Sequence, residues 1–207
     1  MSHHIYQTRA FVIDSRDTGE ANKMLTLFTP DLGLITAAVQ GVRVMKSKLR
    51  PSIQDLSFSK VSLVRGKEIW RLVSADKLIS LYDRRIPLGV RRMMARTLAF
   101  LQRMSPGESR HDELFGMLSK LYSFSFEQKE FFGGMQQSTE ESVERVSVTG
   151  LLAELRILDA LGYGSDHPEL KELSSASEWT QEVILQAVMQ RELVERHIRQ
   201  ALESSHL

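Results

Sequence analysis

Positively charged side chains are the functional groups that this sequence concentrates most strongly. Residues 36–71 contain eight lysines and arginines against only Asp55 and Glu68, a local charge of +6. Cations at successive positions suit the phosphates of a nucleic-acid backbone, and flat aromatic rings between them suit stacking on bases. We therefore predict a nucleic-acid contact surface. Its predicted residues are Arg43, Lys46, Lys48, Arg50, Arg65, Lys67, Trp70 and Arg71.

A second interpretation stays open for this predicted surface. The cations can be the solvated side chains of an exposed loop, and Trp70 can belong to the core of its domain, where large aromatic rings are usually buried. If the cations do contact a backbone, they position the strand without reading its sequence. Their loss should then weaken binding to all strands alike.

A second basic group spans residues 84–103, which include no acidic residue. Arg92, Arg96 and Arg103 fall near one face of a predicted helix, because their spacings approach whole helical turns. This face either is exposed and pairs with acids elsewhere, or captures an acidic peptide or a second nucleic-acid strand.

The residues that usually carry out catalysis do not occur in the required patterns. The sequence has no cysteine, which excludes thiol nucleophiles, disulfides and cysteine-based zinc or iron–sulfur sites. The six histidines never occur in metal-ligand spacing, and Arg65-Gly66-Lys67 is followed by Glu68 where a P-loop needs serine or threonine. We predict that the protein is not an enzyme and binds no cofactor and no metal ion.

The composition is that of a globular protein, with 26% charged and 42% hydrophobic residues. The net charge of +1 hides an asymmetry, because residues 1–80 carry +5 and the remainder carries −4. The basic half is therefore the candidate for a polyanionic partner. The N-terminus lacks the pattern of a signal peptide and no apolar run reaches the length of a membrane span, so we expect a cytoplasmic protein without a membrane partner.

The first half of the sequence predicts short strands that would position the basic residues. Pro30 and Gly33 indicate a turn between the second and third strands, and Arg65-Gly66-Lys67 indicates a hairpin. Five strands match an OB-fold barrel, on which the basic loop after the third strand and the basic hairpin could meet. The predicted strands are 8–15, 22–29, 34–39, 57–64 and 68–74.

The second half changes to helical spacing of its apolar residues. Gly162 has the position of a helix-terminating residue, and Ser138–Glu141 fits a capping box at the end of a polar connection. The predicted fold class is α+β, with a five-stranded OB-fold barrel over 1–78 that binds nucleic acid, followed by an all-helical domain over 79–207. The predicted helices are 87–104, 111–122, 140–161 and 179–203.

Several segments together resemble one known family. They are TPDLGLI at 29–35, Gly41-Val42-Arg43, Ser47-Lys48 and RGKEIWRLVSAD at 65–76. The first half of the sequence is similar over nearly its whole length to the RecO family of bacterial recombination mediators. Beyond residue 80 the resemblance rests mainly on ELRILDALGY at 154–163.

The resemblance implies a function in DNA repair and recombination without catalysis. Members of the RecO family bind single- and double-stranded DNA, anneal complementary strands and work with RecR to load RecA onto strands coated by single-stranded-DNA-binding protein, SSB. It also implies that the acidic C-terminal tail of SSB docks on the helical domain, where Arg92, Arg96 and Arg103 are candidates by their charge. Many members carry a four-cysteine zinc motif after the helix that corresponds to 154–163, but this sequence continues as GSDHPELKEL.

Three alternatives to this function use the same residues differently. An OB-fold module that binds RNA would use the same cations and rings. A protein adaptor would use the basic loop only for acidic protein partners. A metal-dependent nuclease would need carboxylates that converge from separate elements, and pairs such as Asp14/Asp17 or Glu140/Glu141 are more simply loop and helix-cap charges.

Overall fold

The computed structural model describes residues 4–42, 49–80, 86–105, 107–134 and 139–204. The chain forms two compact units, the first made of Met1–Tyr82 with Pro106–Phe115, the second of Asp83–Ser105 with Gly116–Leu207. The domain boundary predicted between residues 78 and 79 falls inside the last strand. A segment that we assigned to the helical half also belongs to the first unit.

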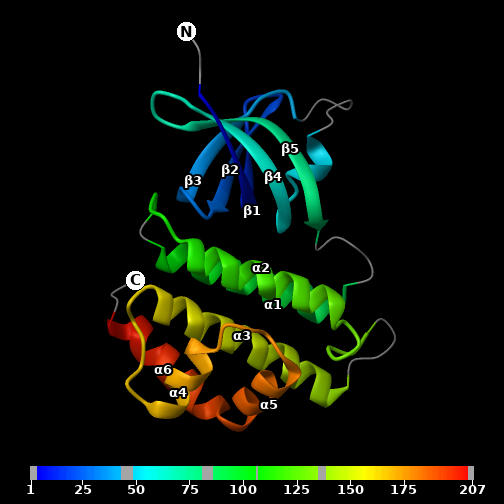
Figure 1. Cartoon of the computed structure of the whole chain (residues 1–207). Helices are drawn as coiled ribbons and strands as arrows, with labels where there is room; N and C mark the ends of the chain where they lie inside the picture. Colours follow the sequence, from blue (N-terminus) through cyan, green and yellow to red (C-terminus); the bar gives the residue numbers. More distant parts are fainter. Residues whose placement is uncertain (1–3, 43–48, 81–85, 106, 135–138, 205–207) are drawn as a thin grey trace. The chain divides into compact units, whose positions relative to one another are not determined.

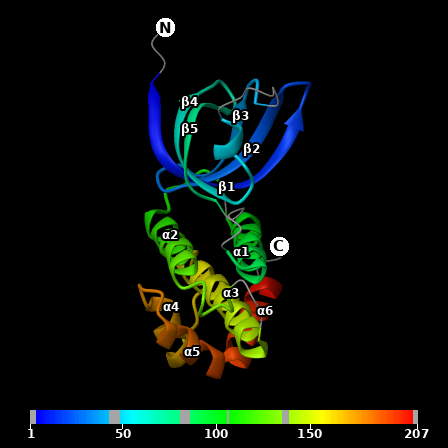
Figure 2. The same cartoon turned by 90° about the vertical axis from the view of Figure 1, so that its right-hand side faces the viewer.

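The first unit is a closed barrel of five strands in the order β1-β2-β3-β5-β4 (Figure 1 and Figure 2). β3 and β5 pair in parallel, and the other neighbouring strands are antiparallel. The prediction of an OB-like barrel followed by helices is confirmed. The elements of the barrel are β1 (Ile5–Thr18), β2 (Asn22–Thr29), β3 (Gly33–Val39), the short 3₁₀ helix η1 (Arg50–Ser52), β4 (Ser57–Arg65) and β5 (Trp70–Ser80).

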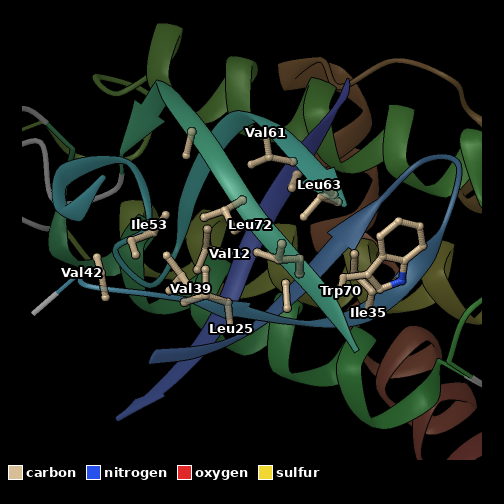
Figure 3. Packing of buried hydrophobic residues seen from close by; sticks show 14 residues of the cluster. Val12, Leu25, Ile35, Val39, Val42, Ile53, Val61, Leu63, Trp70 and Leu72 are labelled. Atoms are coloured by element: carbon tan, nitrogen blue, oxygen red, sulfur yellow. The ribbon is translucent and has the colours of Figure 1, made fainter. Parts of the chain in front are cut away.

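The core of the barrel follows from the alternation of side chains along each strand. In β3, Ile35, Ala37 and Val39 are buried and belong to one cluster with inward-facing residues of the other four strands (Figure 3). Val42 and Ile53, which flank the strands in sequence, are buried in the same cluster. The inward-facing apolar residues of the five strands therefore build one barrel core.

A second apolar layer lies on the opposite side of the strands from this core. The rings of Phe11 and Phe58 stack with centroids 4.6 Å apart, and Phe115 lies 5.2 Å from Phe11. Phe28 also contacts Phe115, at 5.8 Å. Phe115 stands in the first turn of α2 (Asp112–Glu127), which explains why the segment before this helix belongs to the barrel unit.

The segment Gly107–His111, which we call the strap, is bound to the turn between β2 and β3. The Leu34 N–H donates to the Gly107 carbonyl at 3.2 Å, and the His111 N–H donates to the Pro30 carbonyl at 2.9 Å. Gly33 has a positive φ of 65°, and a side chain at this residue would collide with the main chain of Ser109. The predicted turn glycine is confirmed, and it also makes room for the strap.

In the described part of the second unit, α3 is the central helix and packs against four others. The predicted helix over 179–203 is two helices that part at Gln190, and α4 was not predicted. Gly162 has the expected positive φ of 89°, whereas the N-cap of α3 is Thr139 and not Ser138. The helices of this unit, besides α2, are α1 (Leu88–Met104), α3 (Glu140–Ala160), α4 (Pro168–Ser175), α5 (Gln181–Met189) and α6 (Arg191–Ser204).

Candidate nucleic-acid interface

The described cations of the predicted surface form two separate groups on the barrel. Arg50 lines a hollow together with Val42 and Ile53, whereas Arg65 lies over the ring of Trp70. Figure 3 shows Val42 and Ile53 on one side of the core and Trp70 on the other. Among the described residues, Arg50 and Arg65 therefore lie on different sides of the core, and the meeting of the whole basic loop with the basic hairpin stays a prediction. Arg43, Lys46 and Lys48 lie outside the described residues.

The strand register further divides the cations of the hairpin between β4 and β5. Arg65 pairs with Trp70 and Val64 pairs with Arg71, so alternation places Arg71 on the opposite side of the hairpin from Arg65. Lys67 is exposed in the turn between them. Of these three cations, Arg65 therefore lies on the same side as Trp70, Arg71 lies on the opposite side, and Lys67 lies in the turn.

Trp70 belongs to the barrel core, which argues against the predicted stacking of its ring on a base. Its side chain is 3% exposed, and its ring makes an edge contact with Tyr6 at 5.1 Å between centroids. The indole N–H donates to a carboxylate oxygen of Glu108, in the strap, at 3.3 Å. Because the ring has no open face, it cannot stack on a base in this conformation. Of the two interpretations of Trp70, the structure supports the core.

Arg65 is also held by the strap. Its Nη1 lies 2.8 Å from Oε2 of Glu108, and its guanidinium lies 4.8 Å from the centroid of the Trp70 ring. The side chains of Arg65 and Glu108 are 48% and 47% exposed, so this ion pair is open to solvent and to competing anions. Glu108 was not predicted to take part in this site.

Arg50 lines a hollow of about 410 Å³ on the side of the core that lies away from Trp70. Arg50 and Lys23 line it together with one carboxylate, Asp17. The Lys23 ammonium lies 3.6 Å from Asp17 and donates to the Ser15 hydroxyl at 3.1 Å. Lys23 was not among the predicted contacts, because a single lysine within a strand has no distinctive pattern. The hollow offers two cations against one acid.

The helical unit has a hollow of its own, of about 390 Å³, formed by α1, α3 and α6. Two of the three predicted arginines, Arg92 and Arg96, line it, and Arg103 lies about two turns farther along α1. Burial raises the pKa of the Glu154 carboxyl, and the charge of Arg96 opposes this effect. The remaining lining residues are Gly89, Met93, Val143, Val146, Ser147, Gly150, Leu151, Arg191 and Glu195.

Charge in this helical hollow is only partly neutralised within the unit. Arg191 hydrogen-bonds Glu195 at 2.8 Å, which raises the pKa of its guanidinium, and it lies 3.9 Å from Glu144. The described lining of the hollow contains three cations, Arg92, Arg96 and Arg191, against two carboxylates, Glu154 and Glu195. The hollow therefore combines an excess of positive charge with apolar walls.

Comparisons with known proteins identify the family. The family described as "Recombination protein O N terminal" matches residues 1–81, which contain all five strands of the barrel unit. The chain belongs to the RecO family. A DNA repair protein RecO of Dehalococcoides mccartyi is 30% identical over 175 residues, which cover 83% of this chain and 61% of the relative. A DNA repair protein RecO of Heliobacterium modesticaldum is 32% identical over 160 residues, covering 77% of this chain and 52% of the relative.

The chain thus spans about half to three-fifths of the length of these RecO relatives. Among its described helices, none is long and apolar enough to cross a bilayer. The described residues also contain no group of three or more side chains suited to hold a metal ion. The strap lies outside the matched RecO N-terminal segment, so the family match alone does not point to Glu108.

Proposed function

We propose that this RecO family chain is a DNA-binding mediator of repair and recombination that anneals complementary strands. The observation that carries the proposal is the charge of +5 on residues 1–80, almost the same segment that matches the family's N-terminal domain. Two DNA strands repel each other through their phosphates. A cationic barrel surface lowers that repulsion by neutralising phosphates and releasing counterions, so annealing needs no reactive group.

Annealing of complementary oligonucleotides across a salt series tests this proposal. Arg43, Lys46, Lys48 and Arg50 are changed together to alanine. We expect weaker binding of every DNA sequence. The logarithm of the binding constant should also fall less steeply with the logarithm of the salt concentration, and for single strands this salt slope should decrease by about 0.7 for each phosphate that the protein no longer neutralises. Annealing and a salt slope that both survive the change would show that this loop does not bind the DNA.

A matched control removes cations of the helical unit. Lys171, Arg196 and Arg199 are exposed on α4 and α6, and their joint change to alanine should alter the salt slope less per charge removed.

Competition between DNA and RNA of identical sequence separates this function from an RNA-binding module. Loss of substrate that depends on magnesium would instead indicate a nuclease.

The helical hollow supports a second contact, with protein. We propose that it takes the acidic C-terminal tail of SSB, because Arg92 and Arg96 can pair with carboxylates while Met93 and the valines of α3 pack against apolar side chains. Cooperation with RecR and the loading of RecA belong to the same proposal and rest on membership of the family. No described surface is assigned to RecR.

Arg96→Ala is expected to weaken binding of a peptide with the sequence of the SSB tail. Loss of one charge-assisted hydrogen bond corresponds to roughly a tenfold lower affinity, measured by fluorescence anisotropy. Arg199→Ala, on the exposed face of α6, is the control and should leave the affinity unchanged. Equal loss in both variants would indicate nonspecific attraction. Peptide binding without any DNA binding would favour the protein adaptor.

A further inference from the structure

The strap places one carboxylate against two donors of the β4–β5 hairpin. Oε2 of Glu108 accepts from Nη1 of Arg65 at 2.8 Å, and Oε1 accepts from the indole N–H of Trp70 at 3.3 Å. Both oxygens of the carboxylate are therefore bound by different groups of the barrel. Two oxygens of a phosphodiester can be bound by the same pair of donors, because arginine recognises carboxylate and phosphate in the same way.

The surroundings of this pair favour a phosphate chain over an isolated anion. Lys67 is exposed in the turn that follows Arg65. The turn is tight, with the Gly66 N–H donating to the Ile69 carbonyl at 3.0 Å, and a side chain at Gly66 would collide with that carbonyl. Arg65 and Lys67 thus lie two residues apart at the end of a tight hairpin, which suits contacts to neighbouring phosphates of one strand.

The strap does not depend on the side chain of Glu108 for its position. Its main chain is bound on both sides of Glu108, through Gly107 to Leu34 and through His111 to Pro30. Phe115, which follows the strap, is buried in the aromatic layer of the barrel. The Glu108 side chain can therefore leave Arg65 by rotating about its own bonds, without release of the strap.

The ion pair itself is easily exchanged. Arg65 and Glu108 are each about half exposed, and a pair in this environment contributes little net free energy. A phosphodiester that also contacts Lys67 gains a second charge that Glu108 does not use. Whether Arg65 binds the Glu108 carboxylate or the phosphate of an incoming strand therefore depends on the charges beside Arg65.

We propose that the Arg65–Trp70 end of the barrel is a phosphate-binding site for a nucleic-acid backbone, and that Glu108 is its internal competitor. This inference rests on the proposed function, since the phosphates are those of the bound DNA strand. While Glu108 holds Arg65, the site is closed and the affinity for DNA is lowered. When a strand arrives, its phosphate replaces the carboxylate on Arg65.

Binding of single-stranded oligo-dT to four forms of the chain tests the competition. The forms are the wild type, Glu108→Gln, Arg65→Ala and the double variant. Glutamine keeps an acceptor for the Trp70 N–H but removes the charge that holds Arg65, so we expect about threefold to fivefold tighter binding. The gain should disappear in the Arg65→Ala background.

Asp14→Asn is the control for the change in net charge. Asp14 is exposed on β1, and its substitution removes one negative charge from the same unit without freeing Arg65. An equal gain from Asp14→Asn, or a gain from Glu108→Gln that persists without Arg65, overturns the proposal. If the wild type binds DNA and Glu108→Gln does not change the affinity, only this inference fails. If the wild type binds no DNA, the proposed function fails.

A readout on the unsubstituted chain keeps the proposal testable if a variant does not fold. The sequence contains two tryptophans, so a chain labelled with 5-fluorotryptophan gives two ¹⁹F resonances. Oligo-dT should shift the resonance of Trp70, because its N–H loses the Glu108 carboxylate, and should leave that of Trp179 in place. DNA binding without a shift of the Trp70 resonance overturns the proposal.

Discussion

Trp70→Ala is expected to lower the free energy of unfolding by about 3–5 kcal/mol, the range for truncation of a large buried ring. The ring is 3% exposed, packs with its edge against Tyr6 and belongs to the barrel core. Alanine would leave a cavity beside Ile35, which lies next to Trp70 in Figure 3, and would leave Glu108 without one donor. Urea unfolding followed by circular dichroism measures the change.

Trp70→Phe separates this core role from base stacking. Phenylalanine keeps most of the ring volume but loses the hydrogen bond to Glu108, so a loss nearer 1 kcal/mol is expected from the bond, plus a smaller cavity term. If the Trp70 ring stacked on bases instead, Trp70→Ala would leave the free energy of unfolding unchanged and would weaken the binding of single strands by about 1–3 kcal/mol. That result would contradict the assignment of Trp70 to the core.

The barrel could be predicted because its strands have strong local patterns. β3 alternates buried and less buried residues, and the turn before it contains Pro30 and Gly33, so its bounds differ from the prediction by one residue. β1 was predicted too short. Its last residues are polar, and Arg16 and Thr18 are held in the strand by pairing with Met24 and Asn22 of β2. Pairing of this kind lengthens a strand without an apolar signal.

The contact between Glu108 and the hairpin could not be predicted from local patterns. Glu108 follows the end of a predicted helix, where Pro106 and Gly107 indicate only that the helix stops. Its partners Arg65 and Trp70 lie about forty residues earlier and are brought to it by closure of the barrel. The same closure separates Arg50, which lies beside Val42 and Ile53, from Arg65, which lies over Trp70, although the charge count over 36–71 had placed both arginines in one group.

The helical unit contains a buried charge that its sequence does not reveal. Arg156 lies in α3 within the segment ELRILDALGY and is 3% exposed, although an arginine in an amphipathic helix is usually on the surface. Its Nε donates to the Leu173 carbonyl and its Nη2 to the Glu178 carbonyl, both at 3.2 Å. The guanidinium lies 4.1 Å from the centroid of the Trp179 ring. Burial lowers its pKa to about 10, so it stays charged at neutral pH.

Arg156→Met is expected to destabilise the chain by about 3 kcal/mol. Methionine has a similar volume but donates no hydrogen bond, so the Leu173 and Glu178 carbonyls lose their charged donor and Trp179 loses its cation. Arg199→Met, at an exposed position of α6, removes the same charge and should change stability by less than about 0.5 kcal/mol. Chemical unfolding of both variants compares them directly. Equal effects would mean that Arg156 contributes only its charge, and not the connection between α3 and the segment from α4 to α5.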